Sequence, residues 1–159
     1  MNVRIGFGFD VHAFGPGDGV WLGGVRVDYS RGVIAHSDGD VLLHALGDAL
    51  LGAAGLGDLG ELFPDSHQRY RSISSTVLLE DIRGRIADLG YTIGNVDLTL
   101  IGEAPRLAPH REIIRVSIAE LLGIDRSQVS VKATTTEGLG FLGRGEGIGA
   151  QAAVLLIGP

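Results

Sequence analysis

Residues 3–12 read VRIGFGFDVH, an apolar run in which hydrophobic residues occupy every second position. This alternation predicts a β-strand over Val3–Val11. Because side chains two positions apart on a strand project from the same face, Asp10 and His12 are expected to lie side by side. The segment therefore predicts a strand that carries a carboxylate next to an imidazole.

A second polar cluster, HSDGDVLLH at residues 36–44, opens a strongly apolar helical pattern. The pattern predicts a helix from about Asp38 to Leu56, with Ser37 or Asp38 as its N-cap. His44 would then lie early in this helix.

Asp10, His12 and His44 together form a candidate metal site. One carboxylate and two imidazoles suit zinc, and three protein ligands leave the fourth tetrahedral position open, as in catalytic zinc sites. The chain has no cysteine, so any metal must be bound through nitrogen and oxygen. From these residues alone an alternative stays open, in which both histidines are ordinary polar residues at the ends of elements.

The rest of the chain alternates predicted strands and helices. Strands separated by helices predict an α/β (α+β) fold, in which a sheet is covered by helices on one face. No internal repeat or linker interrupts residues 1–159, so we expect a single domain. The remaining predicted elements are a hairpin at 21–27 around Gly23-Gly24, a helix end at Gly57, a turn at 58–63, a loop at 64–72, a helix at 74–89, a strand at 95–101, a helix at 109–122, and strands at 129–133 and 150–157.

Composition argues against several functional classes. The net charge of −6 argues against a nucleic-acid-binding surface, which needs clustered Lys and Arg. The N-terminus has no signal-peptide pattern, and the most apolar stretch, 41–57, is shorter than a membrane span of about 20 residues. We therefore expect a cytoplasmic protein. The 26 glycines predict tight turns and close backbone approaches.

Two further segments each have a functional and a structural interpretation. KATTTE at 132–137 ends a predicted strand with three hydroxyls and a carboxylate. It could form a phosphate-binding turn in which Glu137 holds a hard cation such as Mg²⁺, or it could simply reflect the preference of threonine for strands. APRLAP at 104–109 is either a connector or a rigid backbone ledge that can hydrogen-bond a flat ring.

Eight groups of motifs in this sequence point to one known family: RIGFGFDVH (4–12), AHSDGD (35–40) with His44, GDLG (57–60), LFPD (62–65), GNVD (94–97), APR (104–106) with PH (109–110), KATTTE (132–137) and GRGEG (143–147). Taken together, these motifs resemble the 2-C-methyl-D-erythritol 2,4-cyclodiphosphate synthase family of the non-mevalonate isoprenoid pathway. The sequence departs from the commonest family pattern at DSHQRYR (65–71), which replaces a more familiar Asp-Thr-Asp-Pro run.

The resemblance implies a homotrimer with zinc-containing active sites between neighbouring subunits. It implies that Asp10, His12 and His44 bind zinc and that Glu137 binds a second divalent cation, Mg²⁺ or Mn²⁺. His36 and Thr135 match the transition-state stabilisers of the family. The substrate-binding residues implied are Ser37 with His36 for phosphates; Asp58, Leu59 and Gly60 for sugar hydroxyls; Phe63, Pro64 and Asp65 in the following loop; Gly102, Ala104, Pro105, Arg106, Leu107 and Ala108 for cytosine; and Thr134, Thr135 and Thr136 with Glu137 of the adjacent subunit for the diphosphate.

The activity implied is that of a phosphorus–oxygen lyase. It converts 4-diphosphocytidyl-2-C-methyl-D-erythritol 2-phosphate to 2-C-methyl-D-erythritol 2,4-cyclodiphosphate and releases CMP. Two alternatives stay open: a metal-dependent phosphohydrolase that activates water, and a catalytically silent trimeric module that binds a nucleotide or an isoprenoid. The presence of every candidate ligand argues against the silent module.

Phe9, Phe141 and Arg144 resemble residues that line an apolar cavity on the trimer axis of the family. Three copies of Arg144 close together would be unfavourable without an anion, so the ligand expected there is an isoprenoid diphosphate. In the alternative interpretation, Arg144 stabilises its glycine-rich turn or a subunit contact.

Overall fold

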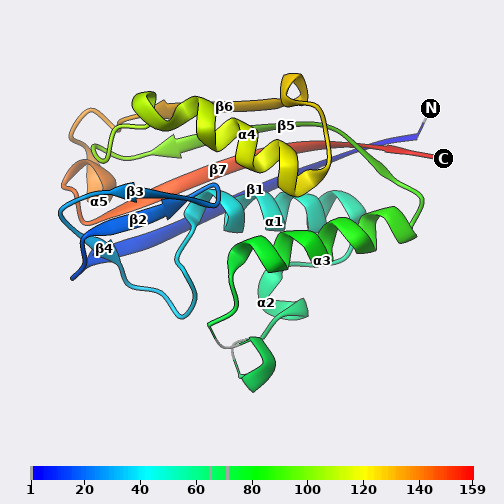
Figure 1. The fold of residues 1–159 in the computed structure, drawn as a ribbon, viewed down its shortest axis with the longest axis horizontal. Helices are drawn as coiled ribbons and strands as arrows, with labels where there is room; N and C mark the ends of the chain where they lie inside the picture. The colour runs from blue at the N-terminus through cyan, green and yellow to red at the C-terminus, as the bar shows by residue number, and fades with distance from the viewer. Residues whose placement is uncertain (1, 65, 71) are drawn as a thin grey trace.

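A mixed five-stranded sheet organises the computed structural model, which describes residues 2–64, 66–70 and 72–159 (Figure 1). Within these residues the strands, in spatial order, are β4 (Gly32–Val33), β1 (Asn2–Gly15), β7 (Gly147–Gly158), β5 (Thr92–Ile101) and β6 (Val129–Thr134). Neighbouring strands are antiparallel except for β5 and β6, which are parallel. The register places Asp10 opposite Ala150 and His12 opposite Ile148.

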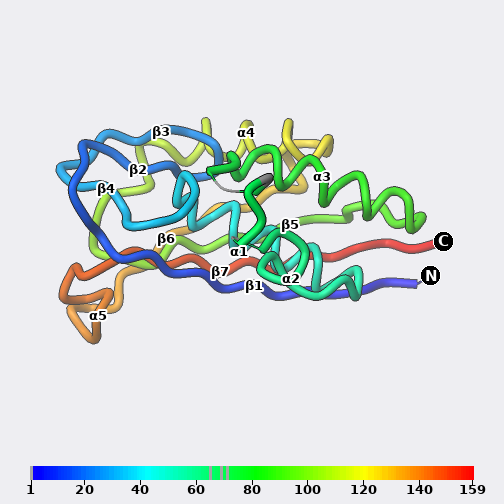
Figure 2. Tube along the Cα trace, turned by 90° about the horizontal axis from the view of Figure 1, so that it is seen from below, coloured from blue at the N-terminus to red at the C-terminus, as the bar shows by residue number. Residues whose placement is uncertain are grey.

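Helices pack against this sheet, as the sequence predicts. Helix α1 (Val41–Ala54) packs on β1 and β7, and α4 (Arg111–Leu122) packs on β6. Helix α3 (Ser75–Asp88) contacts both α1 and α4, and Figure 2 shows α3 and α4 together on one side of the sheet. Among the described residues, no helix is long and apolar enough to cross a membrane.

A separate hairpin consists of β2 (Gly19–Leu22) and β3 (Val25–Asp28). Its turn is formed by Gly23 and Gly24, whose φ angles are +63° and +79°. Two successive positive φ angles are typical of the type I′ turn that joins two-residue hairpins, and glycine adopts them without strain. The predicted hairpin is confirmed.

Several elements differ in extent from the prediction. Strands β1, β5 and β7 continue beyond their predicted ends, because their backbone pairing with neighbouring strands extends further than the apolar alternation. The predicted turn at 58–63 forms a one-turn helix capped by Asp58, whose Oδ1 accepts the Glu61 N–H at 2.8 Å. The short helices are α2 (Leu59–Leu62), η1 (Gln68–Tyr70), η2 (Ala108–His110), η3 (Arg126–Gln128) and α5 (Gly140–Gly143).

The predicted limits of the first long helix are wrong at both ends. The sequence predicts 38–56 with a cap at Ser37 or Asp38, whereas α1 begins after Asp40. Gly39 has a φ of +69°, which breaks the helical conformation before the cap. At the other end the left-handed Gly55, with a φ of +72°, terminates the helix earlier than expected.

Asp40 caps α1 and also holds the turn of the hairpin. Its Oδ1 accepts the N–H of Leu43 at 3.0 Å and that of Gly23 at 2.9 Å, while its Oδ2 accepts the N–H of Gly24 at 2.7 Å. The side chain is fully buried, and this burial raises the pKa of the carboxyl despite the three hydrogen bonds. One buried carboxylate therefore fixes the start of α1 relative to β2 and β3.

Helix α1 approaches β1 closely at two glycines. A Cβ atom at Gly6 would lie 1.9 Å from the carbonyl oxygen of Ala49, and one at Gly8 would lie 1.8 Å from that of Ala45. Such distances leave no space for any side chain, so the approach requires glycine at both positions. The contact at Gly8 lies next to His44 on the helix and two residues before Asp10 on the strand.

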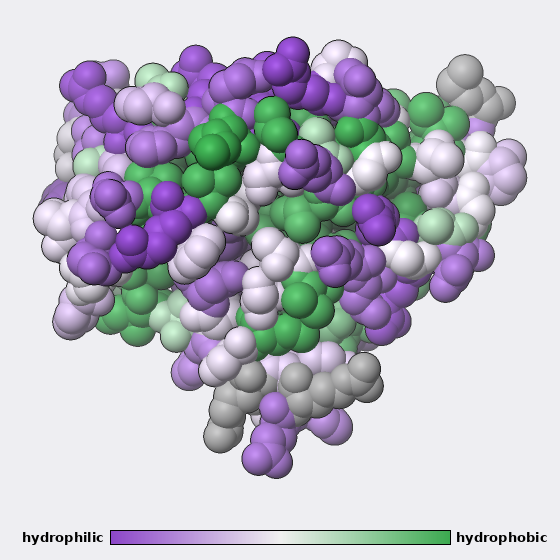
Figure 3. Space-filling view, viewed as in Figure 1, coloured by the Kyte–Doolittle hydropathy of each residue, from purple (hydrophilic) through white to green (hydrophobic). Residues whose placement is uncertain are grey.

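The opposite face of β1 is apolar and exposed. The residues at odd positions of the strand are Val3, Ile5, Phe7, Phe9 and Val11, of which Phe7 is 69% exposed and Phe9 is 56% exposed. Figure 3 shows the surface of the molecule on the side where the helices lie, and there hydrophobic side chains are interrupted by hydrophilic ones. A continuous exposed apolar stripe of this kind is typical of a protein–protein interface.

The close approach at Gly8 predicts a large difference between two glycine-to-alanine substitutions. Gly8→Ala should lower the free energy of unfolding by about 3 kcal/mol, the upper end of the typical cost of overpacking, because its Cβ meets the backbone of α1. Gly52→Ala, within α1 and with no atom within 4 Å of the new Cβ, should raise it by about 0.5–1 kcal/mol through helix propensity. Urea unfolding of both variants measures the difference, and equal effects would contradict the packing described here.

Candidate active site

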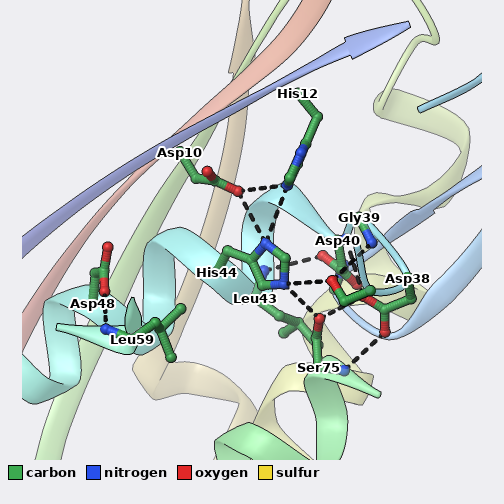
Figure 4. A network of polar contacts seen from close by, with 12 residues as sticks. Asp10, His12, Asp38, Gly39, Asp40, Leu43, His44, Asp48, Leu59 and Ser75 are labelled. Carbon is green, nitrogen blue, oxygen red and sulfur yellow. Dashed lines mark hydrogen bonds and ion pairs between the residues drawn. The ribbon is translucent and has the colours of Figure 1, made fainter. Parts of the chain in front are cut away.

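Three side chains from two elements bring one potential ligand atom each to a common point (Figure 4). Asp10 and His12 come from β1, and His44 comes from the first turn of α1. Asp10 Oδ2 lies 2.9 Å from His12 Nε2 and 3.1 Å from His44 Nδ1, and the two ring nitrogens lie 3.1 Å apart. The predicted convergence of these residues is confirmed.

The spacing of these atoms fits a metal ion. Ligand atoms around a tetrahedral zinc with bonds of 2.0–2.1 Å lie about 3.3 Å apart, close to the separations of 2.9–3.1 Å found here. All three side chains are partly buried, which favours a fixed geometry over a hydrated surface cluster. The donor set of two nitrogens and one oxygen suits zinc and the other transition metals that imidazole binds.

The local electrostatics keep Asp10 ionised. Burial alone would raise the pKa of Asp10, but hydrogen bonds with His12 and His44, together with the charge of both rings, hold it well below its usual range. For His44, burial lowers the pKa, but the bond to Asp10 and the charges of Asp10, Asp40 and Asp38 raise it overall. Metal binding at these three atoms requires His12 Nε2 and His44 Nδ1 to be free of protons.

A cavity of about 400 Å³ opens beside the three side chains. Of the residues predicted to contact substrate or phosphate, His36, Ser37, Leu59, Gly60 and Phe63 line it. Asp58 and Pro64 lie next to the lining residues, and Asp65 lies outside the described residues. One half of the predicted site is therefore assembled within a single chain.

The cavity also includes residues that the sequence analysis missed. Asp48 lines it, and its Oδ1 accepts the Leu59 N–H at 2.9 Å, which joins α1 to α2. Burial raises the pKa of Asp48, and this hydrogen bond offsets the effect only in part. Asp48 follows His44 by four residues, so helical spacing could have identified it. The other missed lining residues are Ile34, Ala35, Tyr70, Ile73 and Leu78.

The remaining predicted residues gather elsewhere, at the ends of β5 and β6. The N–H of Gly102 donates to the carbonyl of Thr134 at 3.0 Å, so the predicted cytosine and diphosphate segments are neighbours. Glu103, which the sequence analysis missed, holds the second segment because its Oε1 accepts the N–H of Thr136 at 3.3 Å and that of Gly138 at 3.4 Å.

These two segments do not reach Asp10, His12 and His44 within one chain. Strands β1 and β6 are separated by β7 and β5, so three strand spacings, or about 14 Å, lie between them. Thr135 and Glu137 are exposed at this far edge of the sheet. The predicted site is therefore divided into two separate halves within one chain.

The residues predicted to line an axial cavity lie apart from the cavity beside the three candidate ligands. Phe9 projects from the exposed face of β1, and Phe141 is exposed on α5. Arg144 pairs with Glu146, with a distance of 2.9 Å between Arg144 Nη2 and Glu146 Oε2. This ion pair agrees with the alternative in which Arg144 stabilises its own turn.

Comparison with known sequences gives one consistent result. The model of the YgbB family matches residues 3–157. A protein of Erwinia tasmaniensis named 2-C-methyl-D-erythritol 2,4-cyclodiphosphate synthase is 57% identical over 155 residues, which cover 98% of this chain and 99% of that protein. A protein of the same name from Methylococcus capsulatus is 59% identical over 153 residues, covering 96% of this chain and 97% of the other.

Solved structures show the same relationship. The bifunctional IspDF of Campylobacter jejuni is 42% identical with a TM-score of 0.93 over 98% of this chain, which spans 42% of that longer protein. IspF of Plasmodium falciparum, solved as a CDP complex, is 38% identical with a TM-score of 0.88 over 99% of this chain and 97% of its own. By sequence and by fold over nearly its whole length, the chain belongs to the YgbB family.

Proposed function

We propose that this chain is a 2-C-methyl-D-erythritol 2,4-cyclodiphosphate synthase with one catalytic domain spanning residues 1–159. It converts 4-diphosphocytidyl-2-C-methyl-D-erythritol 2-phosphate to the cyclic diphosphate and CMP. The observation that carries the proposal is the convergence of Asp10, His12 and His44 beside a cavity of about 400 Å³. The names of its relatives and the CDP bound to its structural relative support the same substrate class.

In this proposal Asp10, His12 and His44 hold a zinc ion. When bound, zinc supplies positive charge that neutralises phosphate oxygens and orients them for reaction. Glu137 of a neighbouring subunit holds the second divalent cation, Mg²⁺ or Mn²⁺, through its exposed carboxylate.

The reaction is an intramolecular displacement at phosphorus. An oxygen of the 2-phosphate forms a bond to the β-phosphorus while the bond from that phosphorus to the CMP oxygen breaks, so CMP leaves with the electron pair. His36 and Thr135 stabilise the oxygens that gain negative charge, and Ser37 donates to phosphate from the wall of the cavity. The apolar side chains of Leu59 and Phe63 keep water away from phosphorus, because attack by water would give a linear product.

The second half of each site comes from a neighbouring copy of the chain in this proposal. The exposed apolar stripe of Val3, Ile5, Phe7, Phe9 and Val11 is the surface through which three copies associate around an axis. Thr134–Glu137 and the cytosine-binding residues 102–108 of one subunit then face the cavity of the next. An isoprenoid diphosphate between the three copies of Phe9, Phe141 and Arg144, and a cytoplasmic location, remain predictions from the sequence.

The products distinguish this proposal from the phosphohydrolase alternative. Incubation of the metal-loaded protein with the cytidine substrate should give CMP and a cyclic diphosphate in equal amounts, because the 2-phosphate is held beside the β-phosphorus. Phosphorus NMR of the mixture identifies both products. A linear 2,4-bisphosphate with CMP would assign the chain to hydrolysis instead.

Replacement of the carboxylate ligand should remove the metal. Asp10→Asn exchanges a charged ligand for a neutral amide, so we expect less than one zinc per ten chains after dialysis and a loss of activity of about 100-fold or more. Metal analysis and a CMP-release assay measure the two effects. Asp125→Asn, at an exposed cap far from the cavity, is the control and should behave as the wild type. Retention of one zinc per chain by Asp10→Asn would exclude Asp10 as a ligand.

A division of the site between subunits predicts complementation. His44→Ala and Thr135→Ala should each be inactive, because each loses a different half of the site. After subunit exchange at equal amounts, about a quarter of the sites should combine two intact halves and recover activity. Exchange is verified by mass spectrometry of differently tagged subunits. Verified exchange without recovered activity would show that each subunit carries its own complete site.

A further inference from the structure

The ring nitrogen of His44 that faces away from Asp10 is held by a buried serine. His44 Nε2 lies 2.8 Å from Ser75 Oγ, at the first residue of α3. Ser75 is fully buried, and its Oγ also lies 2.5 Å from Asp38 Oδ1, while its backbone N–H donates to Asp38 Oδ2 at 2.8 Å. Figure 4 shows the resulting chain of contacts from Asp10 through His44 and Ser75 to Asp38.

The donors and acceptors in this chain can be oriented in one consistent way. The Asp38 carboxylate accepts two backbone N–H groups, from Ser75 and Asp40, and an ionised carboxylate has no proton to donate. The hydroxyl proton of Ser75 therefore goes to Asp38 Oδ1. Ser75 Oγ must then accept from His44, which places the ring proton on Nε2. In a neutral ring, this leaves the Nδ1 lone pair directed toward Asp10 and His12.

We propose that Ser75 and Asp38 are positioning residues that fix the tautomer and ring orientation of His44 so that Nδ1 binds the metal. This inference rests on the metal site of the proposed function. Histidine ligands of metals commonly donate their other ring N–H to an acceptor that sets the tautomer and strengthens the ligand. Here the acceptor is a hydroxyl that is itself polarised by a carboxylate.

A purely structural role for this pair explains less of the geometry. The backbone N–H of Ser75 already ties the start of α3 to Asp38, and Ser74 caps the helix with its Oγ 3.3 Å from the Thr76 N–H. Neither contact requires a hydroxyl at position 75. Ser37 Oγ lies farther from His44 Nε2, at 3.3 Å, so Ser75 makes the shorter contact with the ring.

Adjacent serines provide a matched test. Ser75→Ala should weaken zinc binding by about 10–100-fold, whereas Ser74→Ala, which removes a cap that does not touch His44, should change it by less than about threefold. Zinc dissociation constants are measured by competition with a chromophoric chelator, with circular dichroism to verify folding. His44→Ala defines the binding that is lost when the site is destroyed.

The ring proton gives a readout that a structural role would not affect. In the zinc-loaded protein with ¹⁵N-labelled histidine, the wild type and Ser74→Ala should show His44 protonated at Nε2 with slow exchange. Ser75→Ala should lose this protected signal. Unchanged zinc affinity and an unchanged His44 signal in Ser75→Ala would overturn the inference while leaving the metal site intact.

Two other outcomes are also decisive. If the wild type binds no zinc beyond the level of His44→Ala, the metal site of the proposed function fails and this inference fails with it. If Ser75→Ala does not fold, the ¹⁵N-histidine spectrum of the zinc-loaded wild type is sufficient by itself. A His44 ring protonated at Nδ1 in that spectrum would contradict the proposed orientation.

Discussion

The arrangement of the candidate site depends on how closely helix α1 can approach strand β1. Asp10 and His12 are fixed by a strand that pairs with β7 from Asn2 to Ala13, and His44 is fixed by a helix. Their ligand atoms come within 3.1 Å of one another because Gly8 admits the backbone of Ala45 at a distance that no side chain would allow. The free-energy cost of holding three polar groups close together is therefore offset by apolar packing between α1 and β1.

The two halves of the predicted site differ in how they are supported. The half with the three candidate ligands is partly buried and linked by hydrogen bonds to α3, to α2 and, through Asp40, to the hairpin. The half that contains Thr135 and Glu137 is exposed at the edge of the sheet and is held by Glu103 and by hydrogen bonds within its own turn. In the proposed function, a partly buried half that binds the metal and an exposed half that binds phosphate suit a reaction in which a long, charged substrate must enter before its two phosphates are brought together.

The sequence predicted those features of the structure that depend on residues close together in the chain. Alternation along β1 placed Asp10 beside His12, and the glycine pair placed the turn of the hairpin. The start of α1 could not be read in the same way, because HSDGD offers several capping side chains and the choice of Asp40 depends on backbone donors from the hairpin. The role of Ser75 left no pattern at all, since it lies 31 residues from His44 and meets it only when α3 packs on α1.

Strand β1 encodes two different surfaces in its even and odd positions. Even positions carry the glycines that admit α1 and the candidate ligands Asp10 and His12, while odd positions carry the exposed apolar stripe from Val3 to Val11. A slip of one residue in the pairing of β1 with β7 would exchange the two sets completely. Phenylalanines would then point into a space that excludes even a methyl group, and both candidate ligands would face away from His44. The length of this strand is thus constrained as strictly as its composition, and a single-residue insertion or deletion within it is incompatible with the site.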